Sequence, residues 1–365
     1  MAVVETRVSM WEALAGRAPG QPVGPADPGV WAAVVERLNP ARAMPRLRAG
    51  VERVDLTSVR GTPYAMLRSP DDGGRACYVR LAPEEVALAE LMDGTLTVAR
   101  LVAEFARVCG RLAPDQVVRV VADLAANRLL EELPVDAYAP LDRVARRPLP
   151  VRWGRTLLAA AQGRRMVVAN VDPLITMLYR AGGRWLFTPV AAGLAAVIAL
   201  GGLVLFCWTW WRGSQSVFLT GGSYATGAAV LLGLNVVALA CHELGHALAV
   251  KDAGRRVPAA GVLLYFGIPS VFVDTTDVWM AGRRARLITT AAGPATGLVL
   301  AGIVQLAAGA APQLAGPAFV ISFAWYLNAL FNLNPMLALD GYYLLMDWLE
   351  IPNLRGRGLA WVSAR

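Results

Sequence analysis

Charged residues are scarce in this chain, and they are unevenly spread. Asp, Glu, Lys and Arg make up 17% of the 365 residues, whereas hydrophobic types make up 56%. That balance is too apolar for a simple soluble protein. The charged residues crowd into the first 186 positions, and residues 187–211 contain none. The composition therefore predicts a soluble head that precedes a membrane body.

Cysteine is also rare, and its spacing shows no pairing. The cysteines are Cys77, Cys109, Cys207 and Cys241, without a Cys-x-x-Cys motif. We therefore expect reduced or lipid-buried thiols. The first 16 residues lack a basic segment followed by an apolar core, so a cleaved signal peptide is not expected.

Lysine is nearly absent as well, because Lys251 is the one lysine and arginine supplies the rest of the basic charge behind the net +8. A basic head joined to a membrane body is explained more simply by an anionic cytoplasmic leaflet than by nucleic acid. We therefore expect the lipid bilayer as a partner and expect no nucleic acid.

Histidine is rarer still among the metal-binding types, with 2 residues in the whole chain. Both stand in the stretch Cys-His-Glu-Leu-Gly-His, as His242 and His246 on either side of Glu243. In this pattern two imidazoles one helical turn apart face the same way and can hold one zinc ion. The glutamate can take a proton from a water whose pKa the metal has lowered. The alternative, two histidines packed in a core, is less favoured because the chain uses histidine nowhere else.

Four apolar stretches are predicted to cross the membrane. They are residues 187–211, 224–250, 287–309 and 317–337. The first is long enough for a bilayer core of about 30 Å, and Trp208, Trp210 and Trp211 near its end suit an interfacial belt. Arginines crowd the segment before the first stretch and the segment between the second and the third. The positive-inside rule therefore places the head and both termini in the cytoplasm of a multi-pass protein of the cytoplasmic membrane.

A zinc ion held by two histidines needs a third protein ligand, and three aspartates compete for this role. The apolar stretches at residues 224–250 and 317–337 are expected to cross the membrane in the same direction. Asp340 therefore lies at about the same membrane depth as His242. An ionisable residue there is a functional candidate, although it could also cap the following segment in the headgroup region. Asp274 and Asp277 follow a strand-like run at residues 262–273. We favour Asp340, because the strand-like run is better placed to pair with an extended substrate.

Four short motifs in the second half of the chain form a recognisable set. They are His-Glu-Leu-Gly-His, Gly293-Pro294, Asn334-Pro335 and Asp340-Gly341. Together they resemble the site-2 protease family of intramembrane zinc metalloproteases, over about residues 165–350. The resemblance implies a three-helix core and cleavage of a substrate's membrane-spanning helix after local unwinding.

The same resemblance implies roles for particular residues. His242, His246 and Asp340 would hold the zinc ion, and Asn334 would help to position the substrate or to stabilise the oxyanion. One feature departs from the family, because relatives with this kind of head continue into further spans. This chain stops at Arg365, which leaves open whether it is a fragment of a longer protein.

The head shows the pattern of a small α+β domain. The predicted elements are strands at residues 62–69 and 75–81 around a Pro-Asp-Asp-Gly-Gly turn, helices at 83–92, 98–109 and 114–127, and a strand-like run at 129–133. A hairpin with three short helices suggests a winged-helix fold.

Within this head, about residues 60–135 resemble the PqqD-like peptide-recognition domain. The resemblance is carried by Tyr-Val-Arg-Leu-Ala-Pro-Glu-Glu from residue 78 and by Leu-Met-Asp-Gly-Thr-Leu-Thr from residue 91. It implies that the head binds a peptide by adding a strand to a sheet edge. A folded head without a ligand and a DNA-binding winged helix stay as alternatives, although no helix here carries a dense basic face.

The predicted fold class is an α-helical polytopic membrane protein with a small N-terminal α+β winged-helix domain. The parts are an N-terminal extension (1–55), the PqqD-like domain (56–135), a basic membrane-proximal linker (136–186), the transmembrane metalloprotease core (187–350) and a C-terminal tail (351–365).

Three functions compete at this point. The first is a membrane-embedded zinc endopeptidase that acts on a peptide or transmembrane-helix substrate, with Glu243 as its base. The second is a non-catalytic membrane receptor, or an export or maturation factor, for a modified peptide. The third is a membrane-tethered transcription regulator, which requires salt-sensitive DNA binding by the head. The sequence does not reveal the substrate, the trigger or the oligomeric state.

Overall fold

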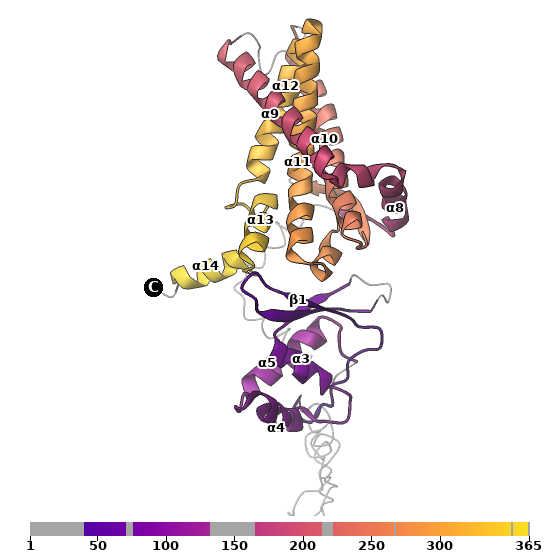
Figure 1. Cartoon of the computed structure of the whole chain (residues 1–365), viewed down its shortest axis with the longest axis vertical. Coiled ribbons are helices and arrows are strands. Elements are labelled where there is room, and N and C mark those ends of the chain that lie inside the picture. Colours follow the sequence, from indigo (N-terminus) through magenta and orange to yellow (C-terminus); the bar gives the residue numbers. More distant parts are fainter. Residues whose placement is uncertain are drawn as a thin grey trace, which may run out of the picture. The chain divides into compact units, whose positions relative to one another are not determined.

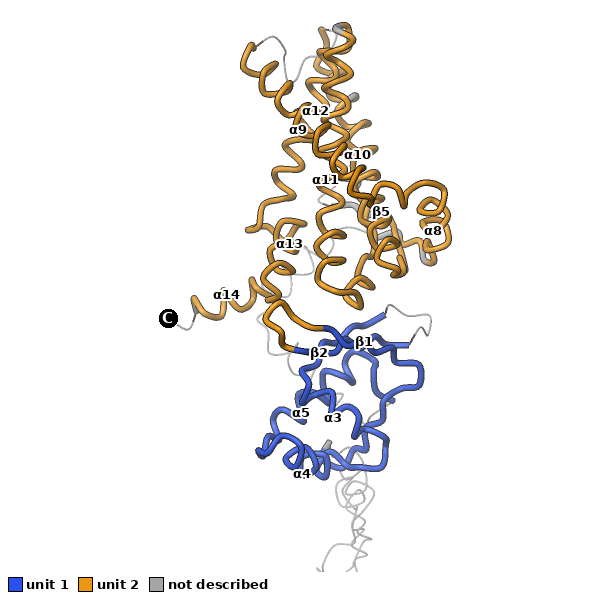
Figure 2. The backbone as a smooth tube through the Cα atoms, viewed as in Figure 1, with its two compact units in different colours: residues 1–56, 63–149 blue, residues 57–62, 150–365 orange. Residues whose placement is uncertain are grey.

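The computed structural model resolves the chain into two compact units (Figure 2). The residues that it describes are 40–70, 76–131, 165–213, 222–265, 268–351 and 353–363. One unit comprises residues 1–56 and 63–149, and the other comprises residues 57–62 and 150–365. The predicted hairpin turn at residues 71–74 and the predicted linker up to residue 164 lie outside the described ranges.

Among its described residues, the first unit contains a three-stranded sheet and three helices (Figure 1). The elements are β1 (Glu52–Thr57), β2 (Pro63–Arg68), β3 (Tyr78–Leu81), α3 (Pro83–Glu90), α4 (Val98–Cys109) and α5 (Pro114–Ala126), after a short 3-10 turn, η1 (Pro40–Arg42). The strand order is β1-β2-β3, and β2 pairs antiparallel with β3. The predicted hairpin strands and three helices are confirmed, whereas the winged-helix assignment and the peptide-binding role stay predictions.

Local signals explain where the head helices begin and end. Pro83 and Pro114 open α3 and α5, at a position where the missing N–H would have no helical partner. The Thr97 hydroxyl accepts a hydrogen bond from the Arg100 backbone N–H and so caps α4. Gly110 ends that helix with φ +71°, a left-handed conformation that glycine adopts without strain.

The apolar faces of these elements meet in one core that begins earlier in the chain than residue 56. Its fully buried members are Leu88, Leu101, Phe105, Val117, Leu124 and Leu129. Ala43 belongs to the same core, and Leu47 forms a β-bridge with Leu130. The packing therefore places residues 43–55 inside the folded head, although the sequence pattern assigned them to an extension. Hydrophobic burial between segments distant in sequence leaves no local pattern to read.

Three long apolar helices dominate the second unit. They are α9 (Pro189–Trp211), α10 (Tyr224–Asp252) and α11 (Arg283–Ala310). By length and composition each can cross a membrane. Helix α9 has 23 residues, which is about 34 Å at 1.5 Å per residue and matches a bilayer core of about 30 Å. Three of the four predicted spans are thus present as candidate membrane helices.

The fourth predicted span, residues 317–337, does not appear as a candidate span among the described helices. Its place is taken by α12 (Ala315–Asn332), which has 18 residues. Asn328 and Asn332 make the last two turns less apolar, and the chain leaves the helix before Pro335. Part of α12 is buried against its neighbours, whereas Leu327, Leu330 and Phe331 are exposed.

Helix α11 is the central element of the second unit, because it packs against α9, α10, α12 and α13 (Asp340–Leu349) (Figure 1). Glycine permits the closest approaches. A Cβ on Gly202 of α9 would collide with the backbone of Gly302 on α11. A Cβ on Gly245 of α10 would lie 2.5 Å from the Thr296 hydroxyl. Close packing through small residues is typical of helices within membranes.

A second three-stranded sheet lies beside these helices. Its strands are β4 (Arg165–Ala169), β5 (Ala259–Tyr265) and β6 (Ile268–Val273), antiparallel in the order β4-β5-β6. The other elements that the structure describes in this unit are α8 (Asp172–Ala181), η2 (Gly183–Phe187), η3 (Thr276–Met280), η4 (Pro312–Leu314) and α14 (Leu354–Ser363). Asp172 of α8 accepts a hydrogen bond from Lys251 at 2.9 Å, which ties α8 to the end of α10. Strand β6 is an edge of this sheet among the described strands and contacts α10.

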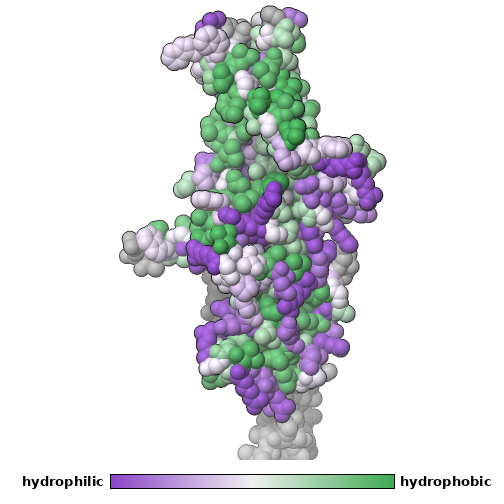
Figure 3. Space-filling model, viewed as in Figure 1, coloured by the Kyte–Doolittle hydropathy of each residue, from purple (hydrophilic) through white to green (hydrophobic). Residues whose placement is uncertain are grey.

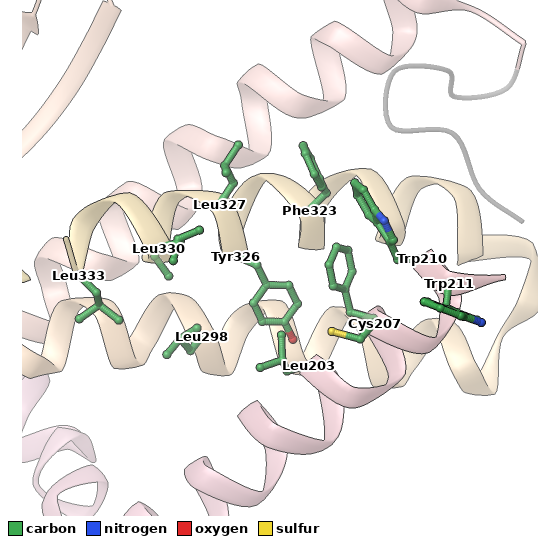
Figure 4. Close-up of a pocket in the computed structure, with 12 residues that line it drawn as sticks. Leu203, Cys207, Trp210, Trp211, Leu298, Phe323, Tyr326, Leu327, Leu330 and Leu333 are labelled. Carbon is green, nitrogen blue, oxygen red and sulfur yellow. The ribbon is translucent and has the colours of Figure 1, made fainter. Parts of the chain in front are cut away.

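The surface of the long helices is strongly apolar (Figure 3). Along α9 the exposed side chains include Val190, Leu194, Val197, Leu200 and Val204. Figure 4 shows an apolar groove of about 620 Å³ that α9, α11 and α12 form. A soluble protein would not expose such an area to water, so these faces suit a lipid environment.

Candidate metal centre

Helix α10 places the two histidines side by side. His242 and His246 are four residues apart, so both side chains lie on one face of the helix. Their Nε2 atoms are 3.1 Å apart, and both residues are buried. The predicted pair therefore forms one half of a compact nitrogen-donor site.

Asp340, the first residue of α13, completes the group. Its Oδ2 lies 3.0 Å from Nε2 of His242, and its Oδ1 lies 3.5 Å from Nε2 of His246. The ligand atoms of all three residues lie within 4.8 Å of one another. The tertiary structure thus brings together the three residues that the sequence suggested as zinc ligands.

The distances test whether a metal ion fits between these residues. Bonds of about 2.0–2.1 Å in a tetrahedral arrangement separate neighbouring ligand atoms by roughly 3.3 Å. The separations of 3.0, 3.1 and 3.5 Å bracket that value. Two nitrogens and one carboxylate are a common donor set for catalytic zinc. The residues present therefore fit a zinc ion.

Helix α11 determines which nitrogen of His246 carries the hydrogen, and it leaves space for the two imidazoles. Nδ1 of His246 lies 2.7 Å from the Thr289 carbonyl oxygen. A carbonyl only accepts, so Nδ1 carries the hydrogen and, in the neutral ring, Nε2 keeps the lone pair that a metal needs. A Cβ on Gly293 would collide with Nε2 of His246 and lie 2.6 Å from Nε2 of His242. Glycine is therefore required where α11 faces the imidazoles.

Asp340 lies outside the candidate membrane helices and stays ionised at neutral pH. Burial raises the pKa of this carboxyl, but the contacts with His242 and His246 lower it more, and the pKa falls to about 2. A carboxylate ligand must be deprotonated to bind a metal ion. Its environment thus keeps Asp340 in the binding form.

Glu243 lies between the imidazoles and the sheet. Its Oε2 accepts a hydrogen bond of 2.9 Å from the Val273 backbone N–H, at the end of β6. The neighbouring Asp274 N–H points into the sheet instead, where it donates to the Ala259 carbonyl at 2.8 Å. The Val273 N–H therefore lies on the outer edge of the sheet. Glu243 is thus placed next to both the metal-binding group and a strand edge that pairs with no other described strand.

The two rival aspartates are engaged elsewhere. Asp274 accepts hydrogen bonds from the backbone N–H and the hydroxyl of Thr276, at 3.1 and 2.5 Å. Asp277 is fully buried and forms an ion pair with Arg255 at 3.0 Å, and it also accepts from the Arg256 N–H at 2.9 Å. Both carboxylates stabilise the turn after β6, and neither belongs to the His-His-Asp group.

Asn334 is turned towards its own loop. Its side-chain oxygen accepts a hydrogen bond of 2.9 Å from the Met336 backbone N–H, which is a typical Asx turn. A small cavity of about 20 Å³, enough for about one water molecule, lies beside His242 and is lined by Asn328 and Asn332. The sequence reasoning did not single out these two. A signal was present in the sequence, because two asparagines four residues apart near the end of an apolar helix lie on one face and are unusual there.

The fold and the site together define a class: membrane-associated helical proteins with a buried His-His-Asp group beside a glutamate. No protein-family profile and no solved structure match the chain. Two curated proteins, from two strains of Mycobacterium tuberculosis, are each 31% identical to it over 160 residues. Both are described as "Putative zinc metalloprotease Rip3". The matched region covers 40% of this chain and 39% of each relative, so well under half of either protein is compared.

Proposed function

We propose that the chain is a membrane-embedded zinc endopeptidase of the site-2 protease type. The observation that carries this proposal is the convergence of His242, His246 and Asp340 from two helices, with Glu243 beside them. The likeness to a protein described as a zinc metalloprotease supports it. The three long apolar helices support a location in the membrane.

Each residue then has a role that follows from its chemistry. His242, His246 and Asp340 would hold the zinc ion, which, when bound, supplies Lewis-acid chemistry for activating water and polarising a carbonyl. The Glu243 carboxylate takes the proton from the attacking water and returns it to the leaving amine. The buried setting of the two histidines limits the water that surrounds the reacting groups.

The outer edge of β6 would hold the substrate. Peptides bind such edges as an added strand, through backbone hydrogen bonds. Because the Val273 N–H on this edge already contacts Glu243, an added strand would pass close to the catalytic carboxylate. A membrane-spanning helix would first have to unwind locally, since only extended backbone can pair with a strand.

The head would recruit the substrate. In its sheet, β1 and β3 are the edges among the described strands, and either could accept a peptide strand. We place this head and both termini in the cytoplasm, because the arginines gather before α9 and between α10 and α11.

The proposal is tested with matched variants of the full chain in proteoliposomes, with synthetic transmembrane-helix peptides as substrates and mass spectrometry to detect products. We expect Glu243→Gln to keep its zinc but to lose at least about 100-fold in rate, because it lacks the base. Asp340→Ala should lose the zinc itself. Cys241→Ala, beside His242 in sequence, serves as the control with full activity.

Two results would contradict the proposal. Full proteolysis by Glu243→Gln would exclude Glu243 as the base. A folded wild-type protein without zinc by elemental analysis would favour the non-catalytic receptor or export factor instead.

A further inference from the structure

The helix that carries the third ligand is short and follows an irregular segment. Helix α13 has 10 residues, and an isolated helix of that length is marginal in water. Residues 333–339 before it form turns and bends. Contacts with other elements must therefore decide where Asp340 lies.

A cluster of buried charges holds the far end of α13. Arg286, in the first turn of α11, is buried, and its Nε donates to Asp347 Oδ1 at 3.1 Å. Its Nη2 donates to Glu350 Oε1 at 3.4 Å. The side chains of Asp347 and Glu350 are 14% and 5% exposed. The arginine thus neutralises two carboxylates that burial would otherwise destabilise.

A second arginine reinforces the same junction. Arg283 donates to the backbone carbonyls of Asp347 and Trp348, at 3.3 and 2.6 Å. Carbonyls in the last turn of a helix lack helical partners, and cations near them are favourable. Arg283 therefore satisfies acceptors at the C-terminal end of α13.

The same stretch of α11 also contacts the histidine side of the site. Thr289, one turn after Arg286, accepts the hydrogen bond from His246. Arg286 and Thr289 are three residues apart, so they lie on one face of the helix. One rigid helix therefore sets both the orientation of an imidazole and the placement of the helix that carries the aspartate.

Helices α11 and α13 are in contact, and an open apolar groove of about 540 Å³ runs along their junction, lined by Leu287, Ile288, Ala291, Gly341, Leu344 and Trp348. Apolar contacts are non-directional, so they fix the position of α13 less strictly than ion pairs do. The ion pairs of Arg286 with Asp347 and Glu350 therefore hold α13 in place against α11.

We propose that Arg286 is a positioning residue for the metal ligand Asp340, acting through its ion pairs with Asp347 and Glu350. This inference rests on the zinc site of the proposed function. Loss of Arg286 frees the end of α13, so the Asp340 carboxylate no longer stays within bonding distance of an ion shared with His242.

The test compares zinc affinity in detergent-purified full-length variants, measured by competition with a chelator. We expect Arg286→Ala to bind zinc about 10- to 100-fold more weakly, as is typical when a residue that orients a metal ligand is removed. Arg284→Ala, an exposed neighbour on the same helix, is the matched control and should change affinity less than about twofold, since Arg284 forms no hydrogen bond or ion pair with the described residues of α13. Arg286→Lys keeps the positive charge but loses the planar guanidinium that contacts both carboxylates, so its zinc affinity should lie between those of the two alanine variants.

A spectroscopic readout separates positioning from general destabilisation. Cobalt(II) bound in a four-coordinate site absorbs strongly in the visible range, and a displaced carboxylate changes that spectrum. We expect an altered spectrum for Arg286→Ala and an unaltered one for Arg284→Ala. Asp347→Asn, which keeps the side-chain volume, provides a second variant if Arg286→Ala does not fold, and it should weaken zinc binding in the same direction.

The outcomes distinguish this inference from the proposed function. No zinc in the wild type would overturn the proposed function. Zinc in the wild type, together with unchanged affinity and an unchanged cobalt spectrum in Arg286→Ala or Asp347→Asn, would overturn the positioning role alone. Recovery of affinity in the charge swap Arg286→Asp with Asp347→Arg, relative to Arg286→Asp, would support it further.

Discussion

At the scale of single residues, the site depends on a glycine as much as on its ligands. Gly293 faces both imidazoles from α11, at a distance that leaves no space for a methyl group. The adjacent Pro294 removes one backbone hydrogen-bond donor from the same helix. Gly293-Pro294 was one of the motifs of the family resemblance. The close approach of the imidazoles explains why its first residue is glycine.

This steric requirement gives a direct prediction. Gly293→Ala should displace the imidazoles and weaken zinc binding at least about 10-fold, because its Cβ would occupy the space of Nε2 of His246. Gly297→Ala, one turn further along α11, is the control, since a Cβ there meets nothing within 4 Å. Chelator competition on both variants measures the difference. Equal affinities would show that α11 can move away from the imidazoles.

Single residues also show why the third ligand could not be read with certainty from sequence. Asp274, Asp277 and Asp340 are alike in type and all follow apolar segments. Only the fold reveals that Arg255 neutralises Asp277 and that Thr276 engages Asp274. Thr276 is two residues from Asp274, whereas Arg255 is 22 residues from Asp277. The contact with Arg255 therefore forms only when the chain has folded back after β6.

At the scale of elements, the long helices are held together by close backbone contacts rather than by charges. Helices α9 and α11 cross where Gly202 meets Gly302. A hydrogen bond of 3.3 Å from Gln305 to Thr209 joins the same two helices further along. Such contacts stabilise helix pairs in lipid, where the hydrophobic effect does not drive association.

The crossing of α9 and α11 can be tested by substitution. Gly202→Ala should lower the stability of the protein by about 1–3 kcal/mol, because the added methyl group overpacks the contact. Gly193→Ala, on the same helix, meets nothing within 4 Å and should be neutral or slightly stabilising. Thermal unfolding in one detergent compares the two. A Gly202→Ala protein as stable as the wild type would mean that the crossing is looser than described.

Helix boundaries were largely predictable at this scale, and the exception is informative. The spans expected at residues 187–211, 224–250 and 287–309 correspond closely to α9, α10 and α11. The stretch at residues 317–337 corresponds only in part to α12, which ends at Asn332 and is not among the candidate spans. Part of α12 is buried by protein neighbours, and hydropathy does not distinguish burial in protein from burial in lipid.

At the scale of the whole molecule, the apolar and charged parts of the second unit suggest an orientation in a bilayer. Arg184 lies 5.1 Å from the ring of Trp185 before α9, and Arg212 lies 4.4 Å from the ring of Trp208 at its end. Tryptophan and arginine pairs of this kind suit both interfaces of a membrane. The excess of arginine on one side agrees with the proposed orientation, with the head in the cytoplasm.

The orientation predicts which residues impermeant reagents reach. In a cysteine-free background, Arg212→Cys should react with an impermeant maleimide on intact cells. Arg357→Cys, an equally exposed arginine position on α14, should react only after the membrane is opened. The reverse pattern would invert the protein and place the head outside the cytoplasm.

The sequence by itself determined what is local. Two histidines at helical spacing must share a face, proline and glycine fix helix ends, and long uncharged runs select lipid, because each of these follows from neighbouring residues. The tertiary structure decided the rest: that Asp340 joins His242 and His246, that α12 packs part of its surface against protein, and that Arg286 reaches α13. These facts depend on contacts between segments far apart in the chain, and their energies exist only after the helices have packed.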